Sequence, residues 1–170
     1  DLKAIENGSF HIIVLWHVLE HIENIGDFMR EINRLISPNG YLLIQVPDIE
    51  RNPYDLAVID HISHFSEKTL ELAINKNGFN VLVNGIEWIH NCITMLAQQS
   101  HINNEIEIMD SYEKNQNIFI WLNKKINYLN KILNEKNYIL FGTGMASLFL
   151  LAQCEIKPVY IMDEDISKKG

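Results

Sequence analysis

The fold of this chain is decided by residues 9–21, SFHIIVLWHVLEH. The five residues 12–16 are all apolar and follow the turn-forming sequence Asn-Gly-Ser. A short unbroken apolar run of this kind is typical of a strand buried on both faces, as in a parallel sheet. Ligands of open α/β sheets bind at the carboxyl ends of strands, so the chemistry is expected directly after this run. Three groups that can carry protons or bind polar ligands stand there: His17, Glu20 and His21.

The composition excludes several classes of protein. Hydrophobic residues make up 47% of the 170 residues, which is enough for a packed core. A net charge of −8, with scattered Lys and Arg, argues against nucleic acid or an anionic membrane as the partner. The only cysteines, Cys92 and Cys154, are far apart, as is usual in a reducing cytoplasm. We therefore expect a cytoplasmic protein with a small-molecule ligand, and the sequence does not predict its oligomeric state.

The residues after the junction predict a βαβ unit. Apolar residues recur at helical spacing through residues 24–36, and Ser-Pro-Asn-Gly at 37–40 predicts a turn. A second strand is expected at 41–46, parallel to the first and reached by a right-handed crossover. Further on, a helix that begins after Ser66 and ends at Asn77-Gly78 should lead to antiparallel strands at 79–83 and 92–98.

The second half of the chain predicts a change of domain. Residues 100–118 are polar and show no firm pattern, whereas residues 121–133 have apolar side chains at helical spacing. Strand, glycine-rich turn, helix and strand are then expected between residues 138 and 163. Both ends of the sequence look cut, because a strand pattern opens it and another has just ended at its close. We interpret the chain as a segment of a longer protein.

The sequence His-x-x-Glu-His at 17–21 is also the zinc motif of inverted metalloproteases. That motif requires both histidines on one face of a continuous helix. Here the predicted strand ends at Trp16, and no third ligand stands out downstream. We therefore expect no metal ligands in the chain. In a second, purely structural interpretation, Glu20 and His21 only begin the helix and pair with each other or with solvent.

Three segments in the right order resemble class I S-adenosylmethionine-dependent methyltransferases: FHIIVLWHVLEHI at 10–22, SPNGYLLIQVP at 37–47 and DHISHFSEKTLELAINKNGF at 60–79. The His-rich element before a Phe-Ser helix cap is similar to bacterial sugar C-methyltransferases, which carry a C-terminal Rossmann-like domain. The resemblance implies an α/β fold, namely a partial Rossmann-like methyltransferase sheet with terminal antiparallel strands, then a helical linker and the start of a second Rossmann-like βαβ unit. The implied domains are the carboxyl-terminal half of a methyltransferase domain (1–98), a polar linker with a connecting helix (99–136) and the start of a second Rossmann-like domain (137–170).

The resemblance also implies a site for the cofactor S-adenosylmethionine. Leu15, Trp16 and His17 would lie beside its methionine and methyl portion. Asp1 stands about where the family has an acid that hydrogen-bonds the adenine amino group. The family's glycine-rich cofactor loop belongs to strands upstream of Asp1, which this sequence does not include, so we expect the chain alone to bind the cofactor poorly.

The acceptor site follows from the same resemblance. Asp60 and His61 are the candidate catalytic dyad, with the carboxylate orienting an imidazole that accepts the acceptor's proton. Glu20, His21 and His64 would bind the acceptor, which we expect to be a nucleotide-linked sugar or an envelope precursor. Sugar C-methyltransferases have Glu where this chain has Asp60. The alternative for His61 and His64 is local capping and packing.

Two other functions stay open. Gly142-x-Gly144-x-x-Ser147, with Asp163 about twenty residues on, approximates the dinucleotide-binding fingerprint. This turn could bind nicotinamide cofactor phosphates at the amino end of the next helix, as in an NAD-dependent sugar-modifying oxidoreductase. The other possibility is a non-catalytic remnant that kept the fold.

Overall fold

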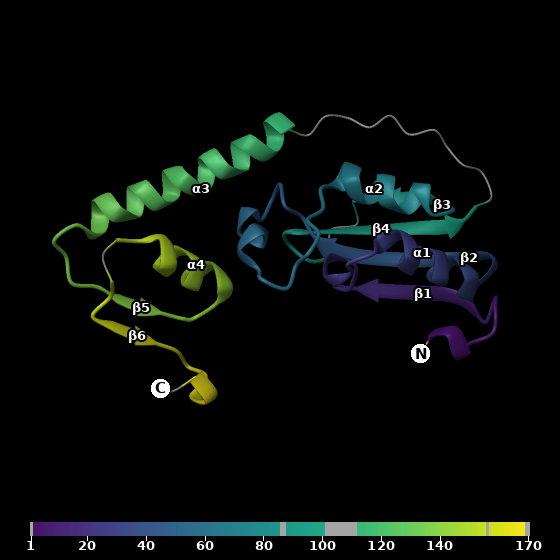
Figure 1. Cartoon of the computed structure of the whole chain (residues 1–170), viewed down its shortest axis with the longest axis horizontal. Helices are drawn as coiled ribbons and strands as arrows, with labels where there is room; N and C mark the ends of the chain where they lie inside the picture. The colour runs from purple at the N-terminus through teal and green to yellow at the C-terminus, as the bar shows by residue number, and fades with distance from the viewer. Residues whose placement is uncertain (1, 86–87, 101–111, 156, 169–170) are drawn as a thin grey trace. The chain divides into compact units, whose positions relative to one another are not determined.

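The computed structural model describes residues 2–85, 88–100, 112–155 and 157–168, without the side chains of 112–115. The chain divides into two compact units, Asp1–Met109 and Asp110–Gly170. Each unit is an α/β arrangement of its own (Figure 1).

The first unit is built on a four-stranded mixed sheet with the order β1-β2-β4-β3. β1 pairs in parallel with β2, whereas β4 is antiparallel to both β2 and β3. The predicted βαβ unit and the antiparallel pair are therefore confirmed. The strands are β1 (Phe10–Trp16), β2 (Ile36–Pro47), β3 (Phe79–Asn84) and β4 (Cys92–Gln99).

Two helices, α1 (Ile25–Leu35) and α2 (Glu67–Lys76), cover one face of this sheet. Asn24 caps α1 by accepting a hydrogen bond from the Asp27 amide, and Ser66 forms a capping box with Thr69 at the start of α2. Both caps satisfy amides that have no partner within the helix. Short 3-10 turns at Leu2–Ala4, Leu19–His21 and Pro53–Ala57 complete the unit.

The core lies between these helices and alternate residues of the two central strands. Leu42, Ile44 and Val46 of β2 stand opposite Ala97, Met95 and Ile93 of β4, and all six are buried. Side chains directly opposite one another in a sheet share a face, so these six form one apolar layer under α1 and α2. The two helices cover this layer with four buried side chains: Met29, Ile32, Leu70 and Ile74.

The turn predicted at residues 37–40, before the second strand, lies within a strand instead, because β2 runs without a break from Ile36 to Pro47. Phe10 pairs with Ile36, but Ile12 pairs with Tyr41, so four residues of β2 face one residue of β1. Asn39 within this bulge has a φ of +62°. The Ser-Pro-Asn-Gly sequence therefore forms a bulge in the ladder between β1 and β2 and does not end the strand.

β1 differs from the prediction that it is buried on both faces. Only β2 pairs with it in the described part of the chain, and the two helices cover only one of its faces. The apolar run is therefore half-exposed on the opposite face, where the outward residues are Ile12, Val14 and Trp16, with exposed fractions of 52%, 51% and 41%.

The second unit begins with the long helix α3 (Tyr112–Leu133). It starts earlier than the helix predicted at 121–133, so the expectation of an irregular chain up to residue 118 is wrong from residue 112 onward. Residues 101–111 lie outside the described residues. β5 (Ile139–Phe141), α4 (Met145–Gln153) and β6 (Tyr160–Met162) follow, and a 3-10 turn ends the unit at Ile166–Lys168.

β5 and β6 pair in parallel, as the predicted βαβ pattern requires. Gly142, directly after β5, has a φ of +90°, which glycine adopts at little cost. None of the helices in the described residues is long and apolar enough to cross a bilayer.

Candidate functional site

Two polar segments meet at the carboxyl end of β1. The first leaves the strand at His17, whose φ of +51° turns the chain sharply into the 3-10 turn that carries Glu20 and His21. The second is the loop before α2. The carbonyl of Glu20 accepts hydrogen bonds from the amides of Ile62 (2.8 Å) and Ser63 (3.1 Å), and these two bonds hold the segments together.

This turn is not the continuous helix that the His-x-x-Glu-His zinc motif needs. The 3-10 turn covers only Leu19–His21, and His17 lies before it in a left-handed conformation. Nδ1 of His17 donates to Oε1 of Glu20 over 3.0 Å, so His17 orients the carboxylate. His17 and His21 are thus not presented on one helical face.

Glu20 is the most deeply buried charged residue of the site, with an exposed fraction of 0%. One carboxylate oxygen is bound by His17, whereas Oε2 has no hydrogen-bond partner among the described residues. A buried carboxylate oxygen without a partner is costly, since its hydration is lost and not replaced.

Asp55 orients two of the predicted site histidines at once. It lies in the 3-10 turn Pro53–Ala57 and is 1% exposed. Its two carboxylate oxygens accept hydrogen bonds from Nδ1 of His61 (2.7 Å) and Nδ1 of His64 (2.6 Å). Both imidazoles are therefore held in one orientation, with Nε2 as the remaining ring nitrogen.

The predicted pairing of Asp60 with His61 is wrong. The Asp60 side chain is 74% exposed, and its carboxylate lies 3.5 Å from Nδ1 of His21. The same His21 nitrogen donates to the Asp60 carbonyl over 2.9 Å. Residues 59 and 60 form a turn in which the Asp60 side chain faces His21 and solvent, whereas the 3-10 turn at Pro53–Ala57 brings Asp55 to His61. An acid in a Pro-initiated turn six residues upstream was the available signal.

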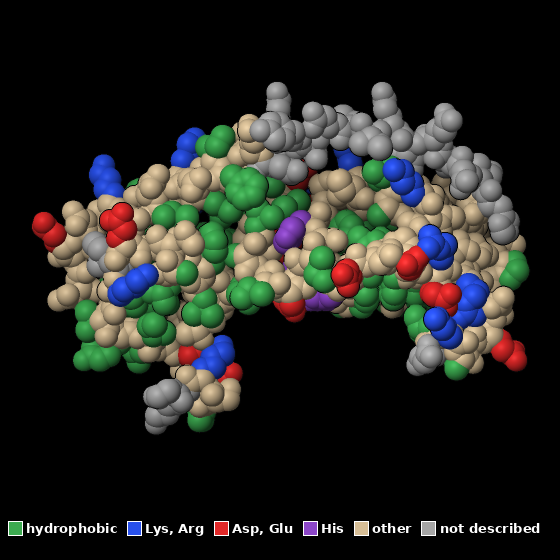
Figure 2. All heavy atoms as spheres, in the orientation of Figure 1, with side chains coloured by type: hydrophobic (Ala, Val, Ile, Leu, Met, Phe, Trp, Pro, Cys, Tyr) green, Lys and Arg blue, Asp and Glu red, His purple; other side chains and the backbone are tan. Residues whose placement is uncertain are grey.

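The rings of His21 and His61 lie next to each other. Their centroids are 4.8 Å apart and their planes are inclined at 79°, an edge-to-face arrangement. One ligand atom each from Glu20, His21 and His61 lies within 4.8 Å of the other two. Figure 2 shows histidine side chains in purple at the molecular surface. The His21 side chain is 38% exposed, so solvent reaches the cluster at this residue.

The pKa values of two buried acidic side chains, Cys92 and Asp48, are raised above their ordinary values. Burial raises the pKa of the Cys92 thiol, and the charges of Glu20, Asp48 and Asp55 raise it further. Cys92 lies 3.8 Å from Nε2 of His17 and remains a neutral thiol there. Burial also raises the pKa of Asp48, and the amide of Glu50 and the charge of Arg51 offset part of that effect.

The residues expected beside the cofactor have different surroundings. Leu15 is 6% exposed and faces the helices, so only its main chain can contact a ligand at the strand end. Trp16 is on the opposite face, where its ring stacks on Trp88 with centroids 6.2 Å apart. A half-exposed aromatic surface therefore lies at the carboxyl end of β1. Asp1 lies outside the described residues.

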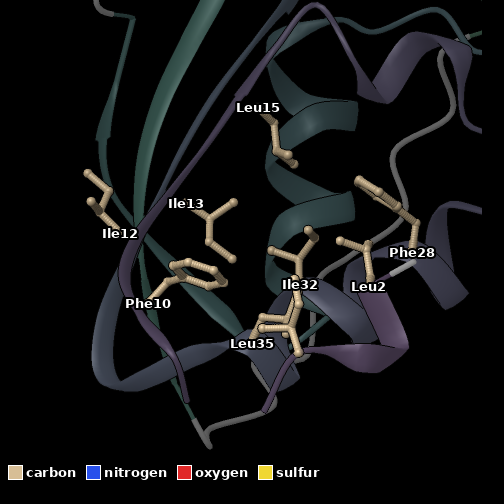
Figure 3. Close-up of a pocket in the computed structure, with 9 residues that line it drawn as sticks. Leu2, Phe10, Ile12, Ile13, Leu15, Phe28, Ile32 and Leu35 are labelled. Carbon is tan, nitrogen blue, oxygen red and sulfur yellow. The ribbon is translucent and has the colours of Figure 1, made fainter. Parts of the chain in front are cut away.

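An apolar cavity of about 370 Å³ lies under the start of β1 (Figure 3). None of the polar site residues lines it. It therefore offers a ligand no hydrogen bond or charge, and we do not assign the site to it. Its lining comes from the amino-terminal turn, β1 and α1: Leu2, Ile5, Phe10, Ile12, Ile13, Leu15, Phe28, Ile32 and Leu35.

In the second unit, Asp163 is already bound within its own turn. Its carboxylate accepts hydrogen bonds from the Thr143 hydroxyl, from the Thr143 amide over 2.7 Å and from Lys168 over 3.2 Å. These bonds, that of the Thr143 hydroxyl most strongly, lower the pKa of Asp163. A ribose at this position would have to displace them.

The comparison with known families gives one match, and it falls on the segment that carries the site. Residues 3–83 match a methyltransferase domain. The matched segment runs from the amino-terminal turn through β3 and includes every described residue of the polar cluster. No curated protein matches the chain.

Solved methyltransferase structures resemble the chain weakly. An S-adenosylmethionine-dependent methyltransferase from Methanosarcina mazei is 15% identical, with 57% of this chain and 62% of that one covered and a TM-score of 0.46. One from Thermotoga maritima is 14% identical, with 56% and 59% covered and a TM-score of 0.48. The Burkholderia thailandensis 1,6-didemethyltoxoflavin-N1-methyltransferase, solved with bound 1,6-didemethyltoxoflavin and S-adenosylhomocysteine, is 15% identical, with 55% and 45% covered and a TM-score of 0.43. The chain thus spans less than two thirds of each of them, and no residue role is transferred from them.

Proposed function

We propose that the protein is an S-adenosylmethionine-dependent methyltransferase that acts on a small molecule at the carboxyl end of β1. The observation that carries this proposal is the methyltransferase-domain match over residues 3–83, because it spans both the βαβ unit and the polar cluster. No comparison supports the nicotinamide-dependent alternative.

The cofactor supplies a methyl group already activated by a sulfonium. The protein then has to hold the acceptor in line with that methyl group, and alignment alone is worth several orders of magnitude in rate. In our proposal Trp16 and His17 form the cofactor side of the site. The main chain of Leu15 lies beside them.

The acceptor side consists of the histidines and Glu20. His61 is our candidate for the group next to the acceptor's reacting atom, and Asp55 takes the orienting role first expected of Asp60. His21 and His64 supply further polar contacts. A carboxylate and several imidazoles suit a hydroxyl-rich acceptor, so we propose a nucleotide-linked sugar or an envelope precursor.

The test is the release of S-adenosylhomocysteine by the purified protein with a panel of nucleotide-linked sugars. We expect product only when both the cofactor and an acceptor are present. If none of the acceptors in this panel gives product, and adding NAD produces a thermal shift, the oxidoreductase alternative is favoured instead.

A substitution at His61 tests the site. Its side chain is 12% exposed and donates to the buried Asp55, so His61→Ala should reduce turnover at least about tenfold and should also lower the melting temperature, because a buried hydrogen bond is lost. His11→Ala, an exposed histidine at the start of β1, is the matched control and should keep full turnover. Full turnover by the fraction of His61→Ala that remains folded would assign His61 to packing.

A further inference from the structure

We propose that Glu20, His21 and His61 form a binding site for a divalent transition-metal ion. The three residues come from two segments, the 3-10 turn after β1 and the loop before α2. Two imidazoles and one carboxylate are the ligand set of several catalytic zinc and iron(II) sites. The ligand set differs from that of the His-x-x-Glu-His motif, because it includes His61 and not His17.

The buried oxygen of Glu20 is the first argument. Oε2 has no partner among the described residues, although the residue is 0% exposed. The other oxygen is held by His17, so the carboxylate has little freedom to turn toward water. A cation beside Oε2 would supply the missing partner and offset the cost of burying the charge.

The orientation of the two imidazoles is the second argument. Metal-bound histidines usually donate their other ring N–H to a carboxylate or a backbone carbonyl. Nδ1 of His61 donates to Asp55 (2.7 Å), and Nδ1 of His21 donates to the carbonyl of Asp60 (2.9 Å). In this tautomer Nε2 of each ring carries the lone pair that a metal ion requires.

The spacing of the ligand atoms leaves a small adjustment to be made. They lie within 4.8 Å of one another, whereas bonds of about 2.1 Å in a tetrahedral site put ligands roughly 3.4 Å apart. Binding thus requires the three ligand atoms to move closer together, and the His21 side chain, which is 38% exposed, is the least confined of the three.

Three protein ligands leave at least one coordination position open. If the proposed methyltransferase function holds, this position faces the acceptor, and a hydroxyl oxygen is the ligand that fits it. His61 would then act through the ion and would not itself accept the acceptor's proton. This last step rests on the proposed function, whereas the binding of the ion does not.

The test is a titration of the chelator-treated protein with Co²⁺, followed in the visible spectrum, and with Zn²⁺ as the competitor. We expect one equivalent of Co²⁺ to give d–d bands that Zn²⁺ abolishes. His21→Ala and Glu20→Gln should each remove the bands, and Asp55→Asn should weaken binding about 10–100-fold because it frees a ligand to turn. His11→Ala should bind as the unchanged protein does.

Absence of the bands in the unchanged protein, or bands that persist in His21→Ala, would overturn the proposal. His21→Ala decides the question even if Glu20→Gln does not fold, because the His21 side chain lies at the surface. The titration uses neither cofactor nor acceptor. Binding without methyl transfer would therefore count against the proposed function alone.

Discussion

Asp55 holds two imidazoles with one carboxylate, and both of its oxygens are used. An amide at the same position has one acceptor oxygen and one donor nitrogen, so it can satisfy only one of the two N–H groups in the same way. The orientation of His61 and His64 therefore depends on this single side chain.

This dependence gives a prediction that separates Asp55 from Asp60. Asp55→Asn should lower methyl-transfer turnover at least about tenfold and destabilise the fold by about 1–3 kcal/mol, since a buried hydrogen bond is lost. Asp60→Asn should change neither, because that side chain is 74% exposed. Nitrogen-15 spectra of the imidazoles check the cause: the His61 and His64 signals should move in Asp55→Asn only. Equal effects of the two substitutions would contradict the assignment.

Asp48 gives a prediction for the pH dependence of stability. Its pKa is raised in the folded protein, chiefly by burial, so the folded state binds the proton more tightly than the unfolded state. The free energy of unfolding contributed by this group is then greatest below the ordinary pKa of Asp and is lost as the pH rises through the raised pKa. Asp48→Asn removes this loss and keeps an oxygen that can accept from the Glu50 amide.

We therefore expect Asp48→Asn to be relatively more stable at neutral pH than near pH 4, when compared with the unchanged protein in urea unfolding. The lost ion pair with Arg51 is partly exposed and contributes little. A difference between the two proteins that does not vary with pH would contradict this account.

At the scale of elements, the residues typical of helix caps and turns predicted most of the helices and strands of the first unit. Helix ends are marked by Asn24, Ser66 and Gly78. Each of them either caps a helix or adopts a positive φ, and both roles depend little on the rest of the fold. The partner of His61 and the exposure of β1 are set by distant segments, so neither could be predicted from local pattern.

A substitution at Gly40 tests how closely β1 packs against the bulge of β2. A Cβ at this position would lie 2.6 Å from Cγ2 of Ile36 and 2.9 Å from the carbonyl oxygens of His11 and Ser37. Gly40→Ala should therefore destabilise the fold by about 1–3 kcal/mol, because β1 and the bulge of β2 would have to separate.

Gly26 in the first turn of α1 is the matched control. Its nearest contact would be at 3.7 Å, and alanine favours a helix. Gly26→Ala should stabilise the protein by about 0.5–1 kcal/mol. Thermal unfolding of both variants measures the difference, and similar melting temperatures would show that the bulge is not tightly packed.

At the scale of the whole molecule, the net charge gives a prediction about large partners. It is −8, and the 14 Lys and Arg residues are scattered along the sequence. Binding to a nucleic acid is driven by basic side chains that replace counterions, so we expect a protein of this charge to bind nucleic acid weakly.

We therefore predict no shift of labelled DNA or RNA by the protein at physiological salt, and no retention on a polyanion column. A shift that weakens steeply with added salt would show that basic residues are gathered on one surface, and would contradict the assignment of a small-molecule acceptor.

The stacked rings of Trp16 and Trp88 give the site an optical consequence. Trp16 directly precedes His17, and His17 is hydrogen-bonded to one carboxylate oxygen of Glu20. A ligand bound at Glu20 is therefore connected to the Trp16 indole by one hydrogen bond and a few covalent bonds. Occupancy should therefore alter the emission of this pair, and replacing the third tryptophan, Trp121, by Phe would leave a protein that reports its own binding events without any added label.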